Sequence, residues 1–186
     1  MTPLLRRHDS PFMLVVGMTG VKLGDRLVQV GCADGGRLAA VASKVGLSGR
    51  AVAVVPDDAS AGRVRKGAER AGVLVEIEIA PPTHLPLEDN AFDLAVIDET
   101  GGLLATMRAD DRAAVVGEAR RVVRPGGRVM VIGAVRRGGL GALFHRAQSV
   151  PAFDPKPLLS GDTFRAVRTL AERDGLVFIE ALKPRT

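Results

Sequence analysis

Residues 26–38 read RLVQVGCADGGRL, and this stretch decides the fold because an apolar run ends in a glycine-rich turn and then restarts as a helical pattern. The run LVQV is typical of a strand that is buried on both faces. Gly31, Gly35 and Gly36 permit a tight turn that leaves the first amide groups of the next helix facing the strand end. Such groups favour phosphate, carboxylate or ribose ligands. The stretch predicts a nucleotide cradle, although a glycine-rich turn also has a purely structural interpretation.

The bulk composition indicates one compact domain. The chain has 186 residues, 46% of them hydrophobic, and a mean hydropathy of +0.15, which is enough to bury a substantial core. We expect a single domain over residues 1–186. Within it, residues 1–20 are expected to form an arm and a short helix, and residues 133–160 a variable cap.

The charge pattern argues against a nucleic-acid partner. The net charge is +5, but the basic residues are scattered along the chain. There is no Trp or Tyr, and only six Phe are available to stack on bases. We therefore expect no nucleic-acid partner and keep nucleic-acid binding as a minor alternative.

The single cysteine, Cys32, excludes an internal disulfide and a cysteine-rich metal site, so we expect no metal and a reducing, cytoplasmic location. An apolar run at residues 12–16 follows Arg6 and Arg7, as in a signal peptide. Glycines interrupt this run, and it is too short to span a bilayer. We expect no membrane partner.

Strand and helix patterns alternate along the chain. The expected strands are 26–30, 51–55, 73–79, 91–97, 128–132 and 176–182, and the expected helices are 12–19, 35–45, 59–71, 109–123, 140–148 and a last one from Ser160 or Asp162 to Gly175. The crossovers are long enough for parallel pairing. We therefore predict an α/β fold with a Rossmann-like, doubly wound, mainly parallel sheet of six strands in the order 3-2-1-4-5-6. The last strand would be an exposed edge, which favours a homodimer through that strand or the last helix.

Three stretches together resemble one family. They are VGCADGG, LPLEDNAFDLAVID and EARRVVRPGGRVMVIG, in the order and spacing of the class I S-adenosylmethionine-dependent methyltransferases. The resemblance covers about residues 22–135. It implies that family's fold, here shortened after the last helix, with S-adenosylmethionine as cofactor and a small molecule as substrate.

The resemblance also shows where this chain departs from the family. In the family, the glycine turn approaches the methionine part of the cofactor, a carboxylate after the second strand binds the ribose, and an acid after the third strand meets the adenine. Gln29 stands where the family has an acid before the turn, and Ala33 stands where it has the middle glycine. Val55 replaces the ribose acid, and Pro81 replaces the adenine acid. Losing two charge-assisted contacts would weaken cofactor binding by roughly two orders of magnitude, towards about 0.1 mM.

The remaining candidates follow from matched positions. Cofactor contacts are expected from Gly31, Cys32, Ala33, Gly35, Asp57, Asp58, His84, Leu85 and Asp98, and the candidate catalytic groups are Asp98, Glu99 and His145. Methyl transfer requires mainly alignment, so a general base is optional. Each candidate also has a structural interpretation: a helix cap for Asp57 or Asp58, a polar rim for the acids at 98 and 99, and a surface or packing role for the histidines.

Three functions stay open at this point. The first is a small methyltransferase that acts on a small molecule through a nonstandard cofactor site. The second is a methyltransferase-fold protein that has lost catalysis, binds S-adenosylmethionine weakly or not at all, and acts as a binding or partner subunit. The third is a nicotinamide-dinucleotide protein, whose glycine spacing Gly31, Ala33 and Gly36 roughly match but in which LPLEDNAFD has no place.

Overall fold

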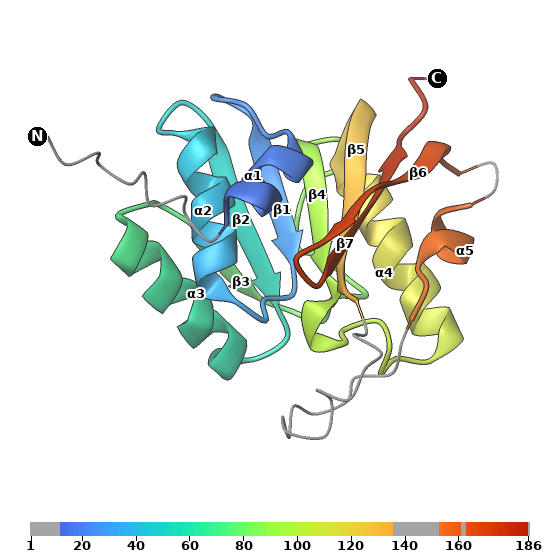
Figure 1. The fold of residues 1–186 in the computed structure, drawn as a ribbon, viewed down its shortest axis with the longest axis horizontal. Helices are drawn as coiled ribbons and strands as arrows, with labels where there is room; N and C mark the ends of the chain where they lie inside the picture. The colour runs from blue at the N-terminus through green and yellow to red at the C-terminus, as the bar shows by residue number, and fades with distance from the viewer. Residues whose placement is uncertain (1–11, 136–152, 161–162, 186) are drawn as a thin grey trace, which may run out of the picture.

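The computed structural model describes residues 12–135, 153–160 and 163–185, and its centre is a seven-stranded sheet in the order β3-β2-β1-β4-β5-β7-β6 (Figure 1). The strands are β1 Arg26–Val30, β2 Arg50–Val55, β3 Glu76–Ile79, β4 Phe92–Asp98, β5 Val123–Ala134, β6 Arg165–Arg173 and β7 Leu176–Leu182. The helices are α1 Met13–Thr19, α2 Gly35–Val45, α3 Asp58–Ala71, α4 Ala109–Val122 and α5 Lys156–Leu159, with a 3-10 turn η1 at Glu99–Gly101. The predicted α/β, Rossmann-like, mainly parallel fold is confirmed.

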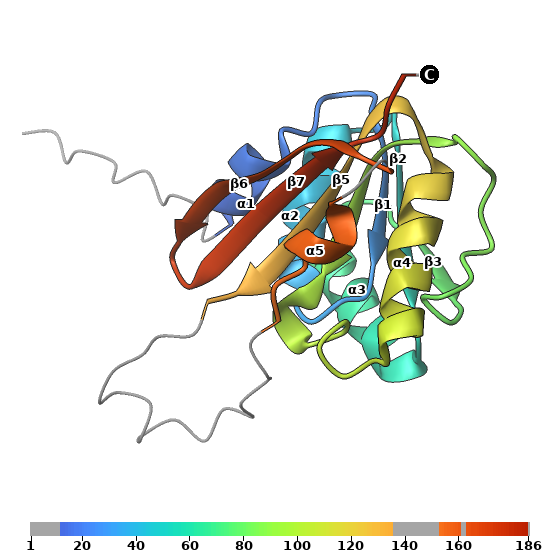
Figure 2. The ribbon, with the colours of Figure 1, turned by 90° about the vertical axis from the view of Figure 1, so that its right-hand side faces the viewer.

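Helices cover both faces of the sheet (Figure 2). One core cluster joins α1, α2 and α3 to the sheet, and the other joins α4 and α5 to its opposite face. The strands β1, β2 and β4 are buried along nearly their whole length because their side chains are apolar in both directions. These three strands pair in parallel and form the rigid base of the candidate site.

The C-terminal hairpin corrects the prediction for the end of the chain. Residues 165–173 form strand β6, not a helix, and they pair antiparallel with β7. The turn explains the difference: Asp174 and Gly175 both have positive φ, 56° and 78°, as a two-residue hairpin turn requires. Pairing with β7 overrides the helical propensity of RAVRTLAER. The expected sheet of six strands and the expected C-terminal shortening are therefore wrong.

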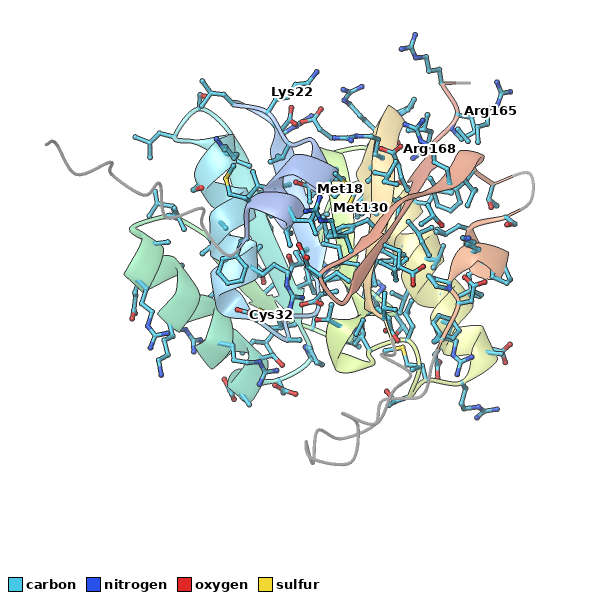
Figure 3. The ribbon with its side chains drawn as sticks, in the orientation of Figure 1. Met18, Lys22, Cys32, Met130, Arg165 and Arg168 are labelled. Atoms are coloured by element: carbon cyan, nitrogen blue, oxygen red, sulfur yellow. The ribbon has the colours of Figure 1, made fainter. Side chains whose placement is uncertain are left out.

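The hairpin also removes the basis for the expected dimer. Strand β7 lies between β5 and β6, so it is not an edge, and the helix that was to adjoin it is absent from the described part of the chain. At this end of the sheet the edge strand is β6, whose register shifts twice and which presents Arg165 and Arg168 to solvent (Figure 3). Bulges and charges of this kind discourage edge-to-edge pairing.

A buried carboxylate joins the two ends of the described chain. Glu180 on β7 is 2% exposed and accepts hydrogen bonds from Arg128 on β5 and Arg168 on β6, at 3.1 and 2.9 Å. Arg128 also donates to the carbonyl of Gly20, which ends α1, at 3.2 Å. The first helix and the last hairpin are thus tied to the same side chain.

Other element boundaries differ only by a few residues. Strand β3 begins at Glu76 rather than at residue 73, and β5 begins at Val123 because it continues through the Pro125–Gly127 turn. The helix predicted at 140–148 and the arm at residues 1–9 lie outside the described residues. In the described ranges, no helix has both the length and the apolar character to cross a membrane.

Helices α2 and α3 touch backbone to backbone. A Cβ placed on Gly67 of α3 would lie 2.2 Å from the carbonyl oxygen of Gly35, the first residue of α2. This contact brings the start of α2, and with it the glycine turn, against α3. Gly62 in the same helix has nothing within 4 Å of its Cβ position.

We expect Gly67→Ala to lower the free energy of unfolding by about 2 kcal/mol, because the added methyl group must push two backbones apart. Gly62→Ala is the matched control and should raise it by about 0.5–1 kcal/mol through helix propensity alone. Urea denaturation of both variants measures the difference. Equal effects at the two positions would contradict the close contact.

Candidate functional site

The candidate site lies at the carboxyl ends of β1, β2 and β4. Strand order reverses between β1 and β4, and ligands of doubly wound sheets bind outside that point. The turn after β1, the start of α3, the loop after β3 and the segment after β4 all meet this edge of the sheet.

The glycine turn has the geometry that the sequence predicts, but its polar groups are used within the chain. Gly31 has φ +77° and its N–H donates to the carbonyl of Val54 at 2.8 Å. The buried amide of Gln29 donates to the Gly31 carbonyl at 3.0 Å. Asp34 caps α2 by accepting from the N–H groups of Gly36 and Arg37 at 2.9 and 3.3 Å. Asp34 therefore takes two of the amide groups that were expected to face a ligand.

Asp98 joins the end of β4 to this turn. It is 3% exposed, and Oδ2 accepts from the N–H of Ala33 at 2.9 Å. Oδ1 accepts from Arg37 Nη1 at 3.1 Å and from the N–H and hydroxyl of Thr100 at 3.1 and 2.6 Å. Arg37 Nη1 also donates to the Thr100 hydroxyl at 2.7 Å. The buried charge of Asp98 is therefore paired and hydrogen-bonded four times inside the protein.

The segment after β4 lies directly against the glycine turn. A Cβ on Gly31 would come within 3.0 Å of Leu103 Cδ2, and one on Gly101 within 3.1 Å of the Ala33 methyl group. Leu104 is fully buried. Glycine is needed at residue 31 because its φ of +77° strains any other residue, and the tip of Leu103 packs against it.

Glu99 holds that segment in place. Its carboxylate accepts from the N–H groups of Leu104 and Ala105, and it is 5% exposed. Arg112 on α4 donates to the carbonyls of the same two residues at 2.8 and 3.1 Å and stacks on Phe153. Burial raises the pKa of Glu99. The carboxylate of this candidate catalytic residue is thus engaged with the backbone.

The expected ribose position is apolar. Val55 is fully buried in the core cluster on the α3 side of the sheet. Asp57 and Asp58 follow it and are exposed. Asp57 caps α3, and the N–H of Ser60, which donates to it at 2.7 Å, holds the pKa of the Asp57 carboxyl below its ordinary value. Asp58 lies in the first turn of α3.

The loop after β3 is clamped by α4. The N–H of Leu85 donates to Glu118 at 2.7 Å, and Arg121 donates to the carbonyls of Leu85 and Leu87, both at 2.8 Å. Arg121 also pairs with Glu118. Leu85 is buried, whereas Pro81 and His84 are exposed on the same loop.

The structure brings most of the predicted site residues to one edge of the sheet. Those at this edge are Gly31, Cys32, Ala33, Gly35, Asp57, Asp58, Asp98 and Glu99, whereas His84 and Leu85 lie further along the loop after β3, where α4 holds it. His145 lies outside the described residues. Sequence reasoning missed Arg37 and Thr100, although a basic residue in the first turn after a glycine loop is a signal that could have pointed to Arg37.

Cys32 lies at the lower end of β1 in Figure 3 and is 5% exposed. Its carbonyl accepts from Arg63 Nε of α3 at 2.8 Å. Burial and, secondarily, the charge of Asp98 raise the pKa of its thiol to about 12. The side chain of Cys32 therefore has a packing role.

An open groove of about 770 Å³ runs from the outer side of the glycine turn between α2 and α3.

Comparison with known proteins gives a consistent family. A family model described as a methyltransferase domain matches residues 28–131. Methyltransferase GfsG from Streptomyces halstedii is 31% identical over 120 residues, which cover 64% of this chain and 41% of that protein. The ubiquinone/menaquinone biosynthesis C-methyltransferase UbiE from Cupriavidus pinatubonensis is 30% identical over 123 residues, which cover 64% and 47%. This chain thus spans less than half the length of these two relatives.

Solved structures share the fold. A SAM-dependent methyltransferase from Aquifex aeolicus superposes with a TM-score of 0.72 at 17% identity, over 93% of this chain and 89% of that one. The [4+2]-cyclase SpnF superposes with a TM-score of 0.67 at 18% identity, over 94% and 80%. At these identities the likeness concerns the fold alone.

We expect the native thiol of Cys32 to resist labelling by iodoacetamide at about pH 8, because it is buried and its pKa is about 12. The same thiol should react fully in urea. Mass spectrometry after timed labelling measures both rates. Rapid labelling of the folded protein would contradict the buried, protonated thiol.

The raised pKa of Glu99 predicts a pH-dependent stability. An acid whose folded pKa exceeds its ordinary value of 4.5 favours folding while protonated, and this contribution is lost as the pH rises from that value through the folded pKa. Glu99→Gln removes the titration. The difference in unfolding free energy, wild type minus variant, should therefore fall as the pH rises above 4.5. Glu172→Gln, at an exposed position, is the control and should show no such trend.

Proposed function

The chain belongs to the methyltransferase-domain family of class I S-adenosylmethionine-dependent methyltransferases. We propose that this protein binds S-adenosylmethionine weakly or not at all and acts as a binding or partner domain. One observation carries the proposal. The carboxylate of Asp98 and the amide of Ala33, at the mouth of the glycine turn, are bonded to each other, and Arg37 pairs with the same carboxylate.

The residues present do not fit the cofactor in the family's manner. At the methionine end, Gln29 bonds the turn itself, and Asp34 takes the first free amides of α2. At the ribose position, Val55 offers no acceptor and is fully buried. At the adenine position, Pro81 has neither a side-chain acceptor nor an N–H group.

Energetics support the same conclusion. Hydrogen bonds to charged groups contribute about 1.5–3 kcal/mol each, so a ligand that needed the Ala33 amide or the Arg37 guanidinium would first have to break bonds of that size. Separating Arg37 from Asp98 would also leave the Asp98 carboxylate buried without its ion-pair partner, which costs more free energy than a lost hydrogen bond. The Ala33 amide and the Arg37 guanidinium are therefore expected to stay bonded to Asp98.

The relatives are consistent with more than one activity on this fold. GfsG and UbiE are methyltransferases, but their activities belong to proteins more than twice the matched length. SpnF is a [4+2]-cyclase with the same fold. Function on a shared fold is determined by the site and not by the architecture.

A second candidate function is methyl transfer to a small molecule. Its support is that Asp57 and Asp58 follow β2 directly and are exposed, so either carboxylate could accept from ribose hydroxyls in place of the acid lost at Val55. When bound, the cofactor would supply an activated methyl group. Asp57 would then serve both as helix cap and as ligand.

Isothermal titration with S-adenosylmethionine and S-adenosylhomocysteine separates the two candidates. We expect dissociation constants of about 0.1 mM or weaker, because two charge-assisted contacts are missing. A constant of a few micromolar that weakens in Asp57→Asn or Asp58→Asn would overturn the proposal in favour of methyl transfer. Glu88→Asn, in the exposed loop after β3, is the control for nonspecific charge effects.

Restoring the missing ribose acid is not a suitable companion experiment. Val55 is fully buried, so Val55→Asp would place a carboxylate in the core cluster around α3. Burying an unpaired charge is strongly unfavourable. A loss of folding would then hide any gain in affinity.

A further inference from the structure

Three consecutive loops at the amino ends of the strands each expose one leucine. Leu23 precedes β1, Leu47 precedes β2 and Leu74 precedes β3, and their exposed fractions are 76%, 92% and 81%. The amino ends of parallel neighbours lie along one edge of the sheet, and β1, β2 and β3 are such neighbours. The three leucines therefore gather on one face of the molecule.

A groove lies among these leucines. It has a volume of about 470 Å³ and runs between the end of α2 and the start of β3. Leu47 and Leu74 line it, and Leu23 contacts Gly46 beside it. The rest of its lining is mainly small or apolar, with Val45, Val73 and Val75 among its side chains. We call the three leucines and this groove the leucine patch.

The charges beside the leucine patch are of both signs. Among the described residues that line the groove, the charged ones are Arg50 and Glu76, which pair with each other at 2.6 Å. Next to Leu23, the backbone N–H of Lys22 donates to the carboxylate of Asp25 at 2.8 Å, so a base and an acid also lie side by side there. A membrane surface or another polyanion would be matched by an excess of positive charge, which this lining does not provide.

We propose that the leucine patch is the contact between two copies of this chain. In a two-fold contact the same patch serves both partners, so it must be complementary to itself. The leucine patch meets this condition, because it presents protruding leucines and a groove to receive them, and because Arg50 and Glu76 at its rim neutralise each other, so that two copies would not repel. A second copy is therefore the occupant whose shape and charge agree with it.

This contact avoids both the sheet edge and the candidate site. In Figure 3, Lys22, beside Leu23, and Cys32, in the glycine turn, lie at opposite ends of β1. A dimer through the leucine patch leaves the carboxyl ends of the strands open. The proposal does not depend on whether S-adenosylmethionine binds.

Light scattering and sedimentation equilibrium over a concentration series test the proposal. We expect the wild type to approach twice its 19.5 kDa chain mass. Leu47→Lys should raise the dimer dissociation constant by about 100-fold, because two leucines are lost per dimer. Met13→Lys, at a residue that is 57% exposed on α1, is the matched control and should dimerise as the wild type does.

Cross-linking locates the contact. Leu47→Cys, treated with a short bis-maleimide, should give a covalent dimer, whereas Met13→Cys should not, and buried Cys32 should stay unmodified in both. A wild type that is monomeric at every concentration would overturn the proposal, and so would a Leu47→Lys variant that dimerises normally. Binding of the monomer to anionic phosphatidylglycerol vesicles that is lost in Leu47→Lys would also overturn it, in favour of a membrane surface.

Discussion

The buried carboxylate of Asp98 is the constraint on which the candidate site depends. A charge that is 3% exposed must be paired, and here it is satisfied by Ala33, Arg37 and Thr100. These partners come from the glycine turn, α2 and η1, so one side chain fixes the relative positions of three elements. The same bonds that order the turn also use the groups with which it would hold a ligand. Order and ligand affinity are thus in competition at this position.

Helix α4 organises the loops that flank this site. Glu118 and Arg121 bind the backbone of the loop after β3, while Arg112 binds the backbone of the segment after β4. Glu118 and Arg121 are the first and fourth residues of the segment EARRVVRPGG, and their partners lie in LPLEDN. Hydrogen bonding therefore links the two sequence stretches, because side chains of EARRVVRPGG supply the donors and acceptors that the backbone of LPLEDN needs.

Much of the fold was predictable because its signals are local. The strands β1, β2 and β4 are apolar on both faces, and Gly31 and Asp34 mark the turn and the cap between β1 and α2. The failure at residues 165–173 arose where a helix-forming segment is held extended by its partner strand, although Asp174–Gly175 is a hairpin signal in the sequence. The state of the site was not predictable, because Arg37 and Asp98 are 61 residues apart and no local pattern connects them. The placement of residues at the strand ends could be predicted, but their bonding partners could not.

The link through Glu180 has a consequence for how the chain acquires its structure during synthesis. Arg128 meets Glu180 across 52 residues and Gly20 across 108 residues, so the carbonyl that ends α1 receives this partner only after most of the chain exists. Long-range contacts of this kind form late and slow the overall rate. On the ribosome, the parallel core of β1, β2 and β4 can assemble first, whereas α1 meets Arg128 only once β5 emerges, and Arg128 itself is fixed by Glu180 only once β7 emerges. The interval between these events is when the apolar face beneath α1 is most open to chaperones and to misassociation.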